Sequence, residues 1–371
     1  MKTVCERNKC AGCMACIDVC PKDAVNIQDS LSAYNAVIDE EKCINCNACH
    51  KVCQRNHFAQ LIEPQLWYQG WANDPEIRKK GSSGGVASEL AKTFLDEGGV
   101  VCSCVFSKGE FVFEFAETKK ELHKFAGSKY VKSNPIGIYK DIRKKLSEEK
   151  KVLFIGLPCQ VSAVKRFIPD KLQNNLYTID LICHGTPSPK ILEKFLEQYK
   201  CKLSEMKDVQ FRKKAKFQVL EGEQGVVEKG VCDRYLISFL NSLNYTDNCY
   251  ECQYARFERV SDITLGDSWG SELSEEEQKQ GVSLILVQTD QGSDLLKRAD
   301  LHLVDVDLEK AIENNHQLKE PSKKTGKRTK FFDGIKKGKS YNGLVYNAFP
   351  KKCLRQDIKK MLIKLRLYEA K

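Results

Sequence analysis

A cysteine motif that occurs twice dominates the start of the chain: CAGCMACIDVC from Cys10 to Cys20, and CINCNACHKVC from Cys43 to Cys53. Each copy has the spacing C-x2-C-x2-C-x3-C. Three cysteines in one such loop bind three irons of a 4Fe-4S cube, and the fourth cysteine of each run binds the other cube. The pattern predicts two clusters, one bound by Cys10, Cys13, Cys16 and Cys53, the other by Cys43, Cys46, Cys49 and Cys20.

A zinc site is the alternative, because two C-x2-C pairs can hold zinc tetrahedrally. Two runs of four cysteines supply more thiolates than zinc needs, and Pro21 directly after Cys20 completes the ferredoxin signature. The stretch from Lys9 to Gln54 resembles a bacterial two-cluster ferredoxin throughout, except that Gln54 stands where the second repeat usually has proline. We therefore predict clusters rather than zinc.

Length and composition place these motifs in a larger globular protein. A chain of 371 residues, 42% hydrophobic and 30% charged, predicts two or three domains with a buried core. No window approaches the ~20 apolar residues of a membrane helix, and Met1 to Cys10 lack the apolar region of a signal peptide. Nine of the 18 cysteines lie in the first 53 residues. A secreted disulfide scaffold would be shorter and exported, so we expect a cytoplasmic protein whose clustered cysteines bind metal.

The formal net charge of +10 is concentrated at one end of the chain. Residues 319–371 contain 17 Lys and Arg against 4 Asp and Glu, so they carry +13 and the other residues −3. This distribution argues against a nucleic-acid-binding face on the folded body. We expect a mobile linker from Lys319 to Lys339 and then an amphipathic helix. The apolar positions of that helix are Leu354, Ile358, Met361, Leu362 and Leu365.

Alternating strand and helix patterns predict an α/β body between these two ends. Helices are expected after the run from Gly81 to Gly85, over 189–199 and over 293–299. The expected strands are Val100–Phe106, Phe111–Phe115, Lys151–Leu157, Leu176–Ile182, Val209–Arg212, Ile263–Leu265 and Val282–Gln288.

Four more cysteines lie in loops of this body. Cys159 and Cys183 each follow a predicted strand, and residues just past strand C-termini converge on the ligand crevice of an α/β sheet. Cys249 and Cys252 form the only C-x2-C pair outside the repeats. On spacing alone these four residues hold a third cube, or are small buried hydrophobes, or Cys159 pairs with His184 as a nucleophile. Six further cysteines are expected to be structural: Cys5, Cys102, Cys104, Cys201, Cys232 and Cys353.

Several segments resemble the beta-subunit family of coenzyme F420 (deazaflavin) hydrogenases and dehydrogenases. The segments are SSGGV at 82–86, GSKY at 127–130, LPCQ at 157–160 and DLICHG at 180–185. Cys249 to Cys252, followed by Arg259, Asp262 and LGDSWG at 265–270, matches the family's later signature. The chain departs from the family at Ser268, where an aromatic residue is common, and at Phe211 to Lys214, which lacks a following Gly-Trp.

This resemblance covers about Trp67 to Val287 and implies an FAD-binding α/β domain with its own 4Fe-4S cluster. The cysteines that match its cluster ligands are Cys159, Cys183, Cys249 and Cys252. The family includes ferredoxin-dependent reductases, enzymes that reduce the deazaflavin and accessory proteins of polysaccharide pathways. The resemblance therefore implies redox chemistry but not one substrate.

The serine- and glycine-rich run before the first predicted helix is the candidate flavin site. Helix N-termini expose unpaired N–H groups, and glycines let a phosphate approach, although Ser and Gly also begin helices that bind nothing. A G-x-G-x-x-G fingerprint is absent from this run. The candidate residues are Ser82, Ser83, Gly84 and Gly85, with Lys129 for a pyrophosphate, Tyr130 to stack on a ring and Gln160 to hydrogen-bond the flavin.

Together these parts predict an iron–sulfur flavoprotein oxidoreductase. Its expected order is an α+β ferredoxin-like domain (1–60), an α/β flavin-binding domain (61–318) and a basic helical tail (319–371). Electrons would pass between the 4Fe-4S clusters and FAD to reduce or oxidise a small organic substrate or a deazaflavin-like carrier, with His184 as candidate proton donor. The alternative is an electron-transfer subunit that serves a separate catalytic partner. The expected partner is an electron carrier such as ferredoxin, docked by the basic tail, or a catalytic subunit.

Overall fold

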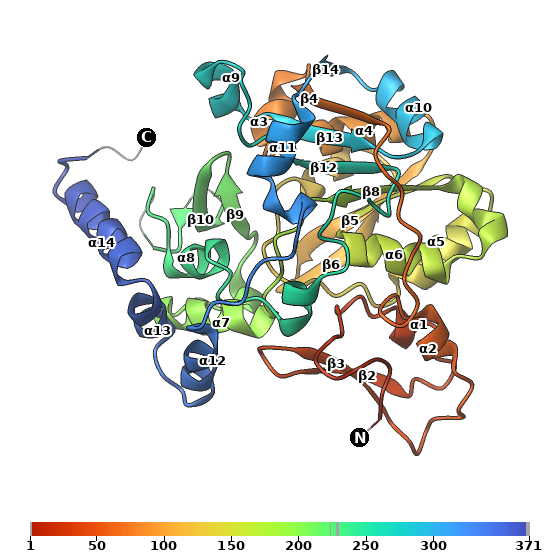
Figure 1. Cartoon of the computed structure of the whole chain (residues 1–371), viewed down its shortest axis with the longest axis horizontal. Helices are drawn as coiled ribbons and strands as arrows, with labels where there is room; N and C mark the ends of the chain where they lie inside the picture. The colour runs from red at the N-terminus through yellow and green to blue at the C-terminus, as the bar shows by residue number, and fades with distance from the viewer. Residues whose placement is uncertain (1, 223, 228–229, 369–371) are drawn as a thin grey trace.

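A computed structural model describes residues 2–368 except 223, 228 and 229. Figure 1 shows a cysteine-rich N-terminal part at the lower right, a central sheet with its helices, and a helical part at the left that ends in the C-terminal segment. The N-terminal part contains a small antiparallel sheet in the order β1-β3-β2 and a short helix within each cysteine motif. Its elements are β1 (Lys2–Thr3), α1 (Ala15–Asp18), β2 (Val25–Asp29), β3 (Tyr34–Ile38) and α2 (Ala48–Val52).

A mixed sheet of eight strands forms the centre of the molecule. Its four middle strands, β12-β8-β7-β5, run parallel, and antiparallel strands flank them on both sides. All five residues of β7 are buried, as expected for a parallel strand that is covered on both faces. In sheet order the strands are β14 (Leu301–Val304), β4 (Leu66–Ala72), β13 (Ser283–Val287), β12 (Ile263–Asp267), β8 (Leu176–Leu181), β7 (Val152–Gly156), β5 (Val100–Ser107) and β6 (Glu110–Ala116).

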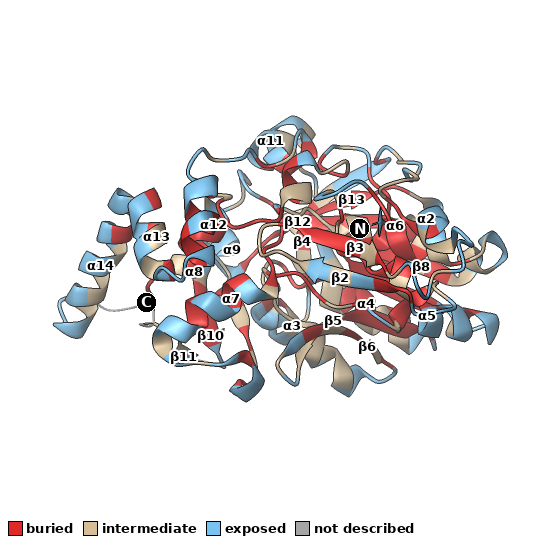
Figure 2. Ribbon diagram, turned by 90° about the horizontal axis from the view of Figure 1, so that it is seen from below, coloured by how far each residue is buried: buried red, intermediate tan, exposed pale blue. Residues whose placement is uncertain are grey.

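Helices cover both faces of this sheet, and the buried strands between them stand out in Figure 2. Alternate residues of a strand point to opposite faces. Thus Leu153 packs in one apolar cluster with α4 (Val86–Asp96) and α10 (Asp290–Arg298), while Phe154 packs in another with α5 (Ile138–Ser147) and α6 (Pro158–Phe167). Shorter helices complete the central part: α3 (Pro75–Lys80), α9 (Glu275–Gln280) and α11 (Leu308–Asn314).

The N-terminal part packs directly against α5 and α6. The buried carboxylate of Asp18 accepts hydrogen bonds from the backbone N–H groups of Gly137 (2.7 Å) and Tyr139 (3.2 Å), at the first turn of α5. It thereby caps a helix of another part of the chain. The hydroxyl of Tyr139 donates in return to the carbonyl of Cys13, at 2.6 Å. The first cysteine motif is therefore held by the helix that covers the sheet.

The left part has its own apolar core. A small antiparallel sheet in the order β11-β10-β9 packs with helices from both the middle and the end of the chain. The elements are α7 (Pro189–Leu196), β9 (Gln210–Lys213), β10 (Lys216–Glu221), β11 (Gln224–Gly225), α8 (Arg234–Leu240), α12 (Arg328–Lys336), α13 (Tyr341–Ala348) and α14 (Pro350–Lys364).

The expected mobile linker from Lys319 to Lys339 is wrong over most of its second half, where α12 forms. Phe331, Phe332 and Ile335 of this helix are 2%, 3% and 5% exposed and belong to the core of the left part. Three apolar side chains at helical spacing were hidden by the surrounding Lys, Gly and Ser residues. The expected terminal amphipathic helix is found as α14.

All seven expected strands are found within two residues of their expected ends. The expected helices appear as α4, as α7 with the 3-10 turn that follows it, and as α10. Among the elements that the expectations missed is β4, which lies inside the sheet between β14 and β13. Others are β10, β14, α5, α6, α8, α11 and α13. No described helix is long and apolar enough to cross a membrane.

We expect Phe331→Ala to lower the stability of the whole protein, because the substitution empties a buried position between α12 and α13. The expected loss is about 3–5 kcal/mol, seen as a lower midpoint of urea unfolding measured without oxygen. Leu354→Ala, on the exposed side of α14, is the matched control and should change stability by less than about 0.5 kcal/mol. If Phe331→Ala lowered stability as little as Leu354→Ala does, α12 would not be part of the core.

Candidate functional site

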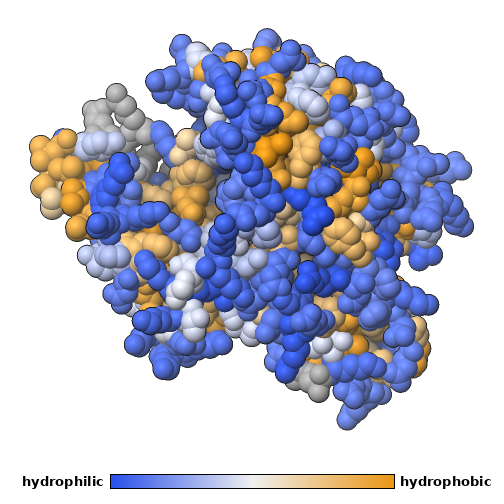
Figure 3. Space-filling view, viewed as in Figure 1, coloured by the Kyte–Doolittle hydropathy of each residue, from blue (hydrophilic) through white to orange (hydrophobic). Residues whose placement is uncertain are grey.

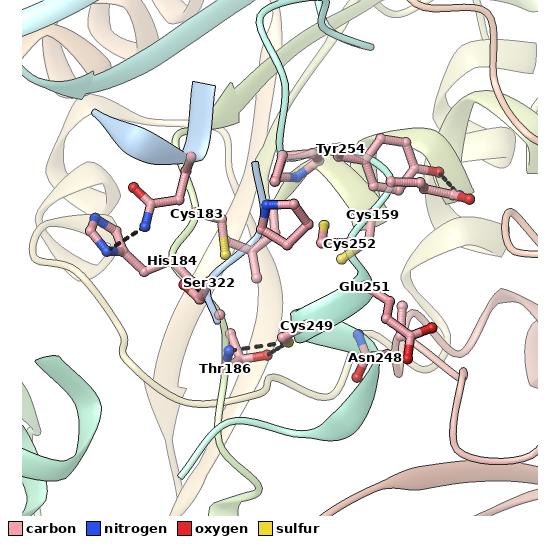
Figure 4. Close-up of a pocket in the computed structure, with 18 of the residues that line it drawn as sticks. Cys159, Cys183, His184, Thr186, Asn248, Cys249, Glu251, Cys252, Tyr254 and Ser322 are labelled. Atoms are coloured by element: carbon pink, nitrogen blue, oxygen red, sulfur yellow. Dashed lines mark hydrogen bonds between the residues drawn. The ribbon is translucent and has the colours of Figure 1, made fainter. Parts of the chain in front are cut away.

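The cysteines of the second set come together around one pocket (Figure 4). Cys159 lies in the first turn of α6, Cys183 two residues after β8, and Cys249 and Cys252 at the 3-10 turn Asp247–Glu251. All four line a pocket with an empty volume of about 680 Å³, part of which is open to solvent. The structure thus brings together four cysteines that are spread over almost a hundred residues of sequence.

The central sheet explains this convergence. β7 and β8 are parallel neighbours, so the loops after them leave the same edge of the sheet. Pro158 occupies the first position of α6, where its missing N–H costs nothing, and places Cys159 in the next position. The third loop is held by Cys249, whose sulfur accepts a hydrogen bond from the backbone N–H of Thr186 at 3.4 Å. Each cysteine is therefore fixed by backbone structure.

Burial disfavours the charged form of these thiols. It raises the pKa of Cys159 to about 12, and it raises the pKa of Cys183 and of Cys252 as well. Burial is the largest cause of the raised pKa of Cys183 and of Cys252, and the charge of the neighbouring Cys249 is the second. The thiols therefore lie within electrostatic reach of one another. A free Cys159 thiol with this pKa is a poor nucleophile, which disfavours its pairing with His184 for acyl transfer.

The two cysteine motifs form two further pockets. Cys10, Cys13, Cys16 and Cys53 line one of them, and Cys20, Cys43, Cys46 and Cys49 line the other. In both pockets the fourth residue comes from the other motif, as the ferredoxin spacing predicts. We call these pockets the inner cage and the outer cage. Cys5, which was expected to be structural, also lines the inner cage, and nothing in the spacing of the repeats indicates it.

Each of the three pockets is lined by four of the predicted ligand cysteines, the number of thiolates that a 4Fe-4S cube takes. Among the residues that the structure describes, no group of three or more His, Cys, Asp or Glu side chains is placed to hold a metal ion. All four ligands predicted for the inner cage are buried, whereas Cys46 of the outer cage is exposed.

The inner cage and the pocket of the second set share a wall. Ala11, Gln54 and Arg55 line both spaces. The side chain of Gln54 is fixed there by hydrogen bonds from Gln253 (3.0 Å) and from the hydroxyl of Tyr254 (2.5 Å), which follow Cys252 in the chain. Gln54, noted in the sequence only as a departure from proline, is thus a contact between the two cysteine sites.

His184 lines the same pocket but its ring is held on the side away from the sulfurs (Figure 4). Its Nδ1 lies 3.0 Å from Nε2 of Gln317, which donates the hydrogen bond as an amide N–H must. Burial first and then the nearby His316 lower the pKa of His184 to about 4, which favours a neutral imidazole at pH 7. With the Gln317 amide donating to Nδ1, the ring proton is assigned to Nε2. The role of His184 as a proton donor remains a prediction.

Two of the candidate flavin residues, Ser82 and Tyr130, are linked by Arg212, which sequence reasoning missed. The Arg212 guanidinium donates to the Tyr130 hydroxyl (3.3 Å) and to the Ser82 carbonyl (2.7 Å), and it pairs with Asp267 at 2.6 Å. The charges of Asp267 and Arg212 are among the influences on the pKa of His184. The ring of Tyr130 stacks on Phe239 at 4.4 Å.

The polar groups of the other candidate flavin residues are engaged with protein atoms. The backbone N–H of Gly84 donates to Ser283 (3.0 Å), the ammonium of Lys129 donates to the carbonyls of Phe125 (2.8 Å) and Ala126 (3.0 Å), and the Gln160 amide donates to Ser133 (2.8 Å). A Cβ at position 84 would lie 2.4 Å from a backbone oxygen, so close packing alone explains that glycine. The structure does not test the contact of these residues with a flavin.

We expect the second cysteine set to account for one third of the iron. Anaerobically purified protein should contain about twelve irons per chain, and Cys183→Ala should lower this to about eight, because one cube would lose a ligand. Cys201→Ala is the control and should keep all the iron, since Cys201 lies outside the three pockets. Chemical iron and sulfide analysis gives the counts. Eight irons in the unsubstituted protein would leave the four cysteines without a cluster.

Comparison with known proteins agrees with this geometry. A model of the 4Fe-4S dicluster domain matches residues 9–57. Models of the N-terminal and C-terminal parts of the coenzyme F420 hydrogenase/dehydrogenase beta subunit match residues 67–137 and 149–307. Together these matches extend from the first cysteine motif to just after β14 and leave the last helices outside them.

Similar curated proteins come from methanogens. The beta subunit of F420-dependent formate dehydrogenase 1 of Methanococcus maripaludis is 27% identical over 242 residues, which are 63% of this chain and 59% of that protein. The coenzyme F420 hydrogenase subunit beta of Methanosarcina barkeri is 28% identical over 141 residues, which are 34% of this chain and 47% of that protein. The chain thus spans less than two thirds of the length of these relatives.

Among solved structures, a chain of the F420-reducing NiFe hydrogenase complex from Methanosarcina barkeri, determined as a xenon derivative, superposes with a TM-score of 0.49 at 22% identity. The match covers 69% of this chain and 91% of that chain. On the strength of the matching models, the chain belongs to the coenzyme F420 hydrogenase/dehydrogenase beta-subunit family and has a 4Fe-4S dicluster domain at residues 9–57.

Proposed function

We propose that this chain is an iron–sulfur flavoprotein oxidoreductase that passes electrons between a protein carrier and a flavin-linked substrate. The observation that carries the proposal is the wall of Ala11, Gln54 and Arg55, which lines both the inner cage and the pocket of Cys159, Cys183, Cys249 and Cys252. We infer that redox groups held in two spaces that share a wall would lie close enough to exchange electrons. Bound 4Fe-4S clusters carry single electrons and FAD converts them into two-electron chemistry.

The exposure of the cysteines suggests where electrons enter the protein. The outer cage contains the exposed Cys46, next to Ile44, which is 57% exposed. The four predicted ligands of the inner cage are buried, and this cage shares a wall with the pocket of the second set. We infer that a carrier protein docks at the loop Cys43–Cys49 and that electrons cross from the outer cage to the inner cage and on to the pocket.

The flavin is proposed to lie beyond this pocket, along Ser82, Tyr130 and Arg212. The hydrogen bonds from Arg212 to Ser82 and Tyr130 support this position, and the charges of Asp267 and Arg212 act on the pKa of His184, which lines the pocket. His184 would then stand between the cysteines and the flavin, with its proton on Nε2. The relatives are named for their dependence on coenzyme F420, so we propose a deazaflavin-like carrier as the substrate.

A second candidate is an electron-transfer subunit that has no substrate of its own. The names of the relatives favour it, because both are subunits of a hydrogenase or a formate dehydrogenase. The C-terminal helix offers a place for such a partner. The apolar side chains Leu354, Ile358, Met361 and Leu365 of α14 are 46–59% exposed, and Lys and Arg flank them, which fits a catalytic subunit with an acidic rim (Figure 3).

This surface lies at the opposite end of the molecule from the cysteine motifs (Figure 1). A partner on α14 would therefore be held in place there but would not exchange electrons with the outer cage. From its charge alone, we expected the basic tail to dock an electron carrier. Its position makes it better suited to binding a catalytic subunit.

An anaerobic redox experiment separates the two candidates. The purified protein, reduced with a low-potential donor, should contain about one FAD per chain and should be reoxidised by the oxidised deazaflavin alone, because the flavin would pass a hydride to it. Absorbance spectra follow both chromophores. Reoxidation only after addition of another protein, and by no small molecule, would favour the electron-transfer subunit, and a protein without flavin would contradict the flavoprotein proposal.

Docking at the outer cage predicts different effects for two substitutions of exposed apolar residues. Ile44→Glu should slow electron exchange with a reduced ferredoxin about tenfold, equivalent to about 1.4 kcal/mol, because it places a charge at the proposed contact. Leu354→Glu, the matched control on α14, should leave this rate unchanged. Stopped-flow absorbance gives the rates, and iron analysis verifies intact clusters. If only Leu354→Glu slows exchange, the carrier docks on the tail.

A further inference from the structure

A buried lysine lies in the wall between the inner cage and the pocket of the second cysteine set. Lys132 is 5% exposed and lines that pocket together with Cys159. Its ammonium donates a hydrogen bond of 2.8 Å to the carbonyl of Ala11, the residue after Cys10, and lies 5.4 Å from the centre of the Tyr34 ring. The ammonium thus belongs to the pocket of the second set and is hydrogen-bonded to Ala11, which lines both that pocket and the inner cage.

Both cysteine sites hold this lysine in position. Its backbone N–H donates to the carbonyl of Pro187, in the loop that begins with Cys183, at 2.9 Å. On the other side, Gly12 has a φ of +75°, and a Cβ there would lie 2.9 Å from the Tyr34 ring and 3.4 Å from the Lys132 side chain. Gly12 thus leaves the space through which the lysine reaches the first cysteine motif.

Lys132 differs in its partners from two other cations of this pocket, Lys9 and Arg259. Lys9 pairs with Glu251, and the buried Arg259 pairs with Asp180 at 2.9 Å. Within the described part of the chain, the Lys132 ammonium contacts a neutral carbonyl and an aromatic face, and it forms no ion pair with a carboxylate. Burying an ammonium without an opposite charge costs free energy, because the group loses its hydration. An anion in this pocket would therefore be stabilised by Lys132, and the side chains that it contacts do not supply one.

Lys132 also lies beside the second cysteine set, because its side chain and Cys159 line the same pocket. A positive charge at that place favours negative charge on a cluster bound there.

We propose that Lys132 is the shared counter-charge of two clusters, the one in the inner cage and the one held by Cys159, Cys183, Cys249 and Cys252. The inference rests on the proposed function. Each one-electron reduction adds one negative charge to a site, and a fixed positive charge at the wall between two sites makes each of them easier to reduce. Lys132 would thereby hold the reduction potentials of these two neighbours above the potential they would have alone. The outer cage, which neither Lys132 nor its hydrogen-bond partner Ala11 lines, would be unaffected.

The test compares Lys132→Gln, which keeps a hydrogen-bond donor but removes the charge, with Lys132→Arg, which keeps the charge. The full chain with its iron is titrated without oxygen and followed by electron paramagnetic resonance. In the Gln variant, two cluster signals should shift to lower potential, with the reduction equilibrium about tenfold less favourable, or about 59 mV for one electron. The third signal should stay in place, and the Arg variant should resemble the unsubstituted protein. Cys183→Ala identifies the signal of the second set.

Each outcome bears on the proposal. Unshifted potentials in a Gln variant that retains its iron would overturn it, and so would an equal shift of all three signals. Loss of iron from the Gln variant but not from the Arg variant would support the need for the charge, whereas loss from both would assign Lys132 a packing role only. If the unsubstituted protein holds only eight irons, the third cluster of the proposed function fails, but the effect of Lys132 on the inner cage is still measured.

Discussion

One continuous apolar core joins the cysteine-rich N-terminal part to the central sheet, and the relation between the cysteine sites depends on it. Ala15 and Val52 of that part belong to the same buried cluster as Phe154 of β7 and Val161 of α6. Polar contacts across this core, from Asp18 to the start of α5 and from Tyr139 to Cys13, determine how the two parts face each other. Burial of such a shared surface is the main stabilising contribution that opposes separation of the two parts. A flexible tether could not keep two cysteine sites on either side of one wall.

The sequence predicted the strands and the grouping of the cysteines well, for different physical reasons. β7 is a continuous apolar run because both faces of a parallel strand are covered, and such a run is visible without a structure; β8 is mainly apolar but includes the buried Thr178 and Asp180. The repeat spacing reflects the geometry of one local loop, so it predicts both cages. The second set needed the family resemblance, since its convergence depends on the order of strands in the sheet. The domain boundaries at about 60 and 318 remain predictions.

What the sequence did not reveal are residues whose role depends on distant partners. Lys132, Arg212 and Gln317 are ordinary polar residues in the sequence and acquire a role only where strands, loops and the C-terminal segment meet. α12 was missed for the same reason, because Phe331 and Phe332 are apolar exceptions in a basic segment until α8 and α13 cover them. Arg328 at the start of α12 donates to the carbonyls of Ser32 (3.0 Å) and Tyr245 (2.8 Å). The C-terminal part thus braces the loop that leads to Cys249.

The unequal exposure of the two N-terminal cages has a consequence for survival in air. Dioxygen reaches a metal–sulfur centre from solvent, so the centre next to Cys46 would be attacked first, while the buried cysteines Cys10, Cys13, Cys16 and Cys53 shield the centre behind it. Brief oxidative damage would then stop electron transfer from the carrier protein, while the buried centre remained intact. Repair of this single surface-exposed site would restore electron transfer into the protein. Oxidative damage would thus be confined to the outer cage.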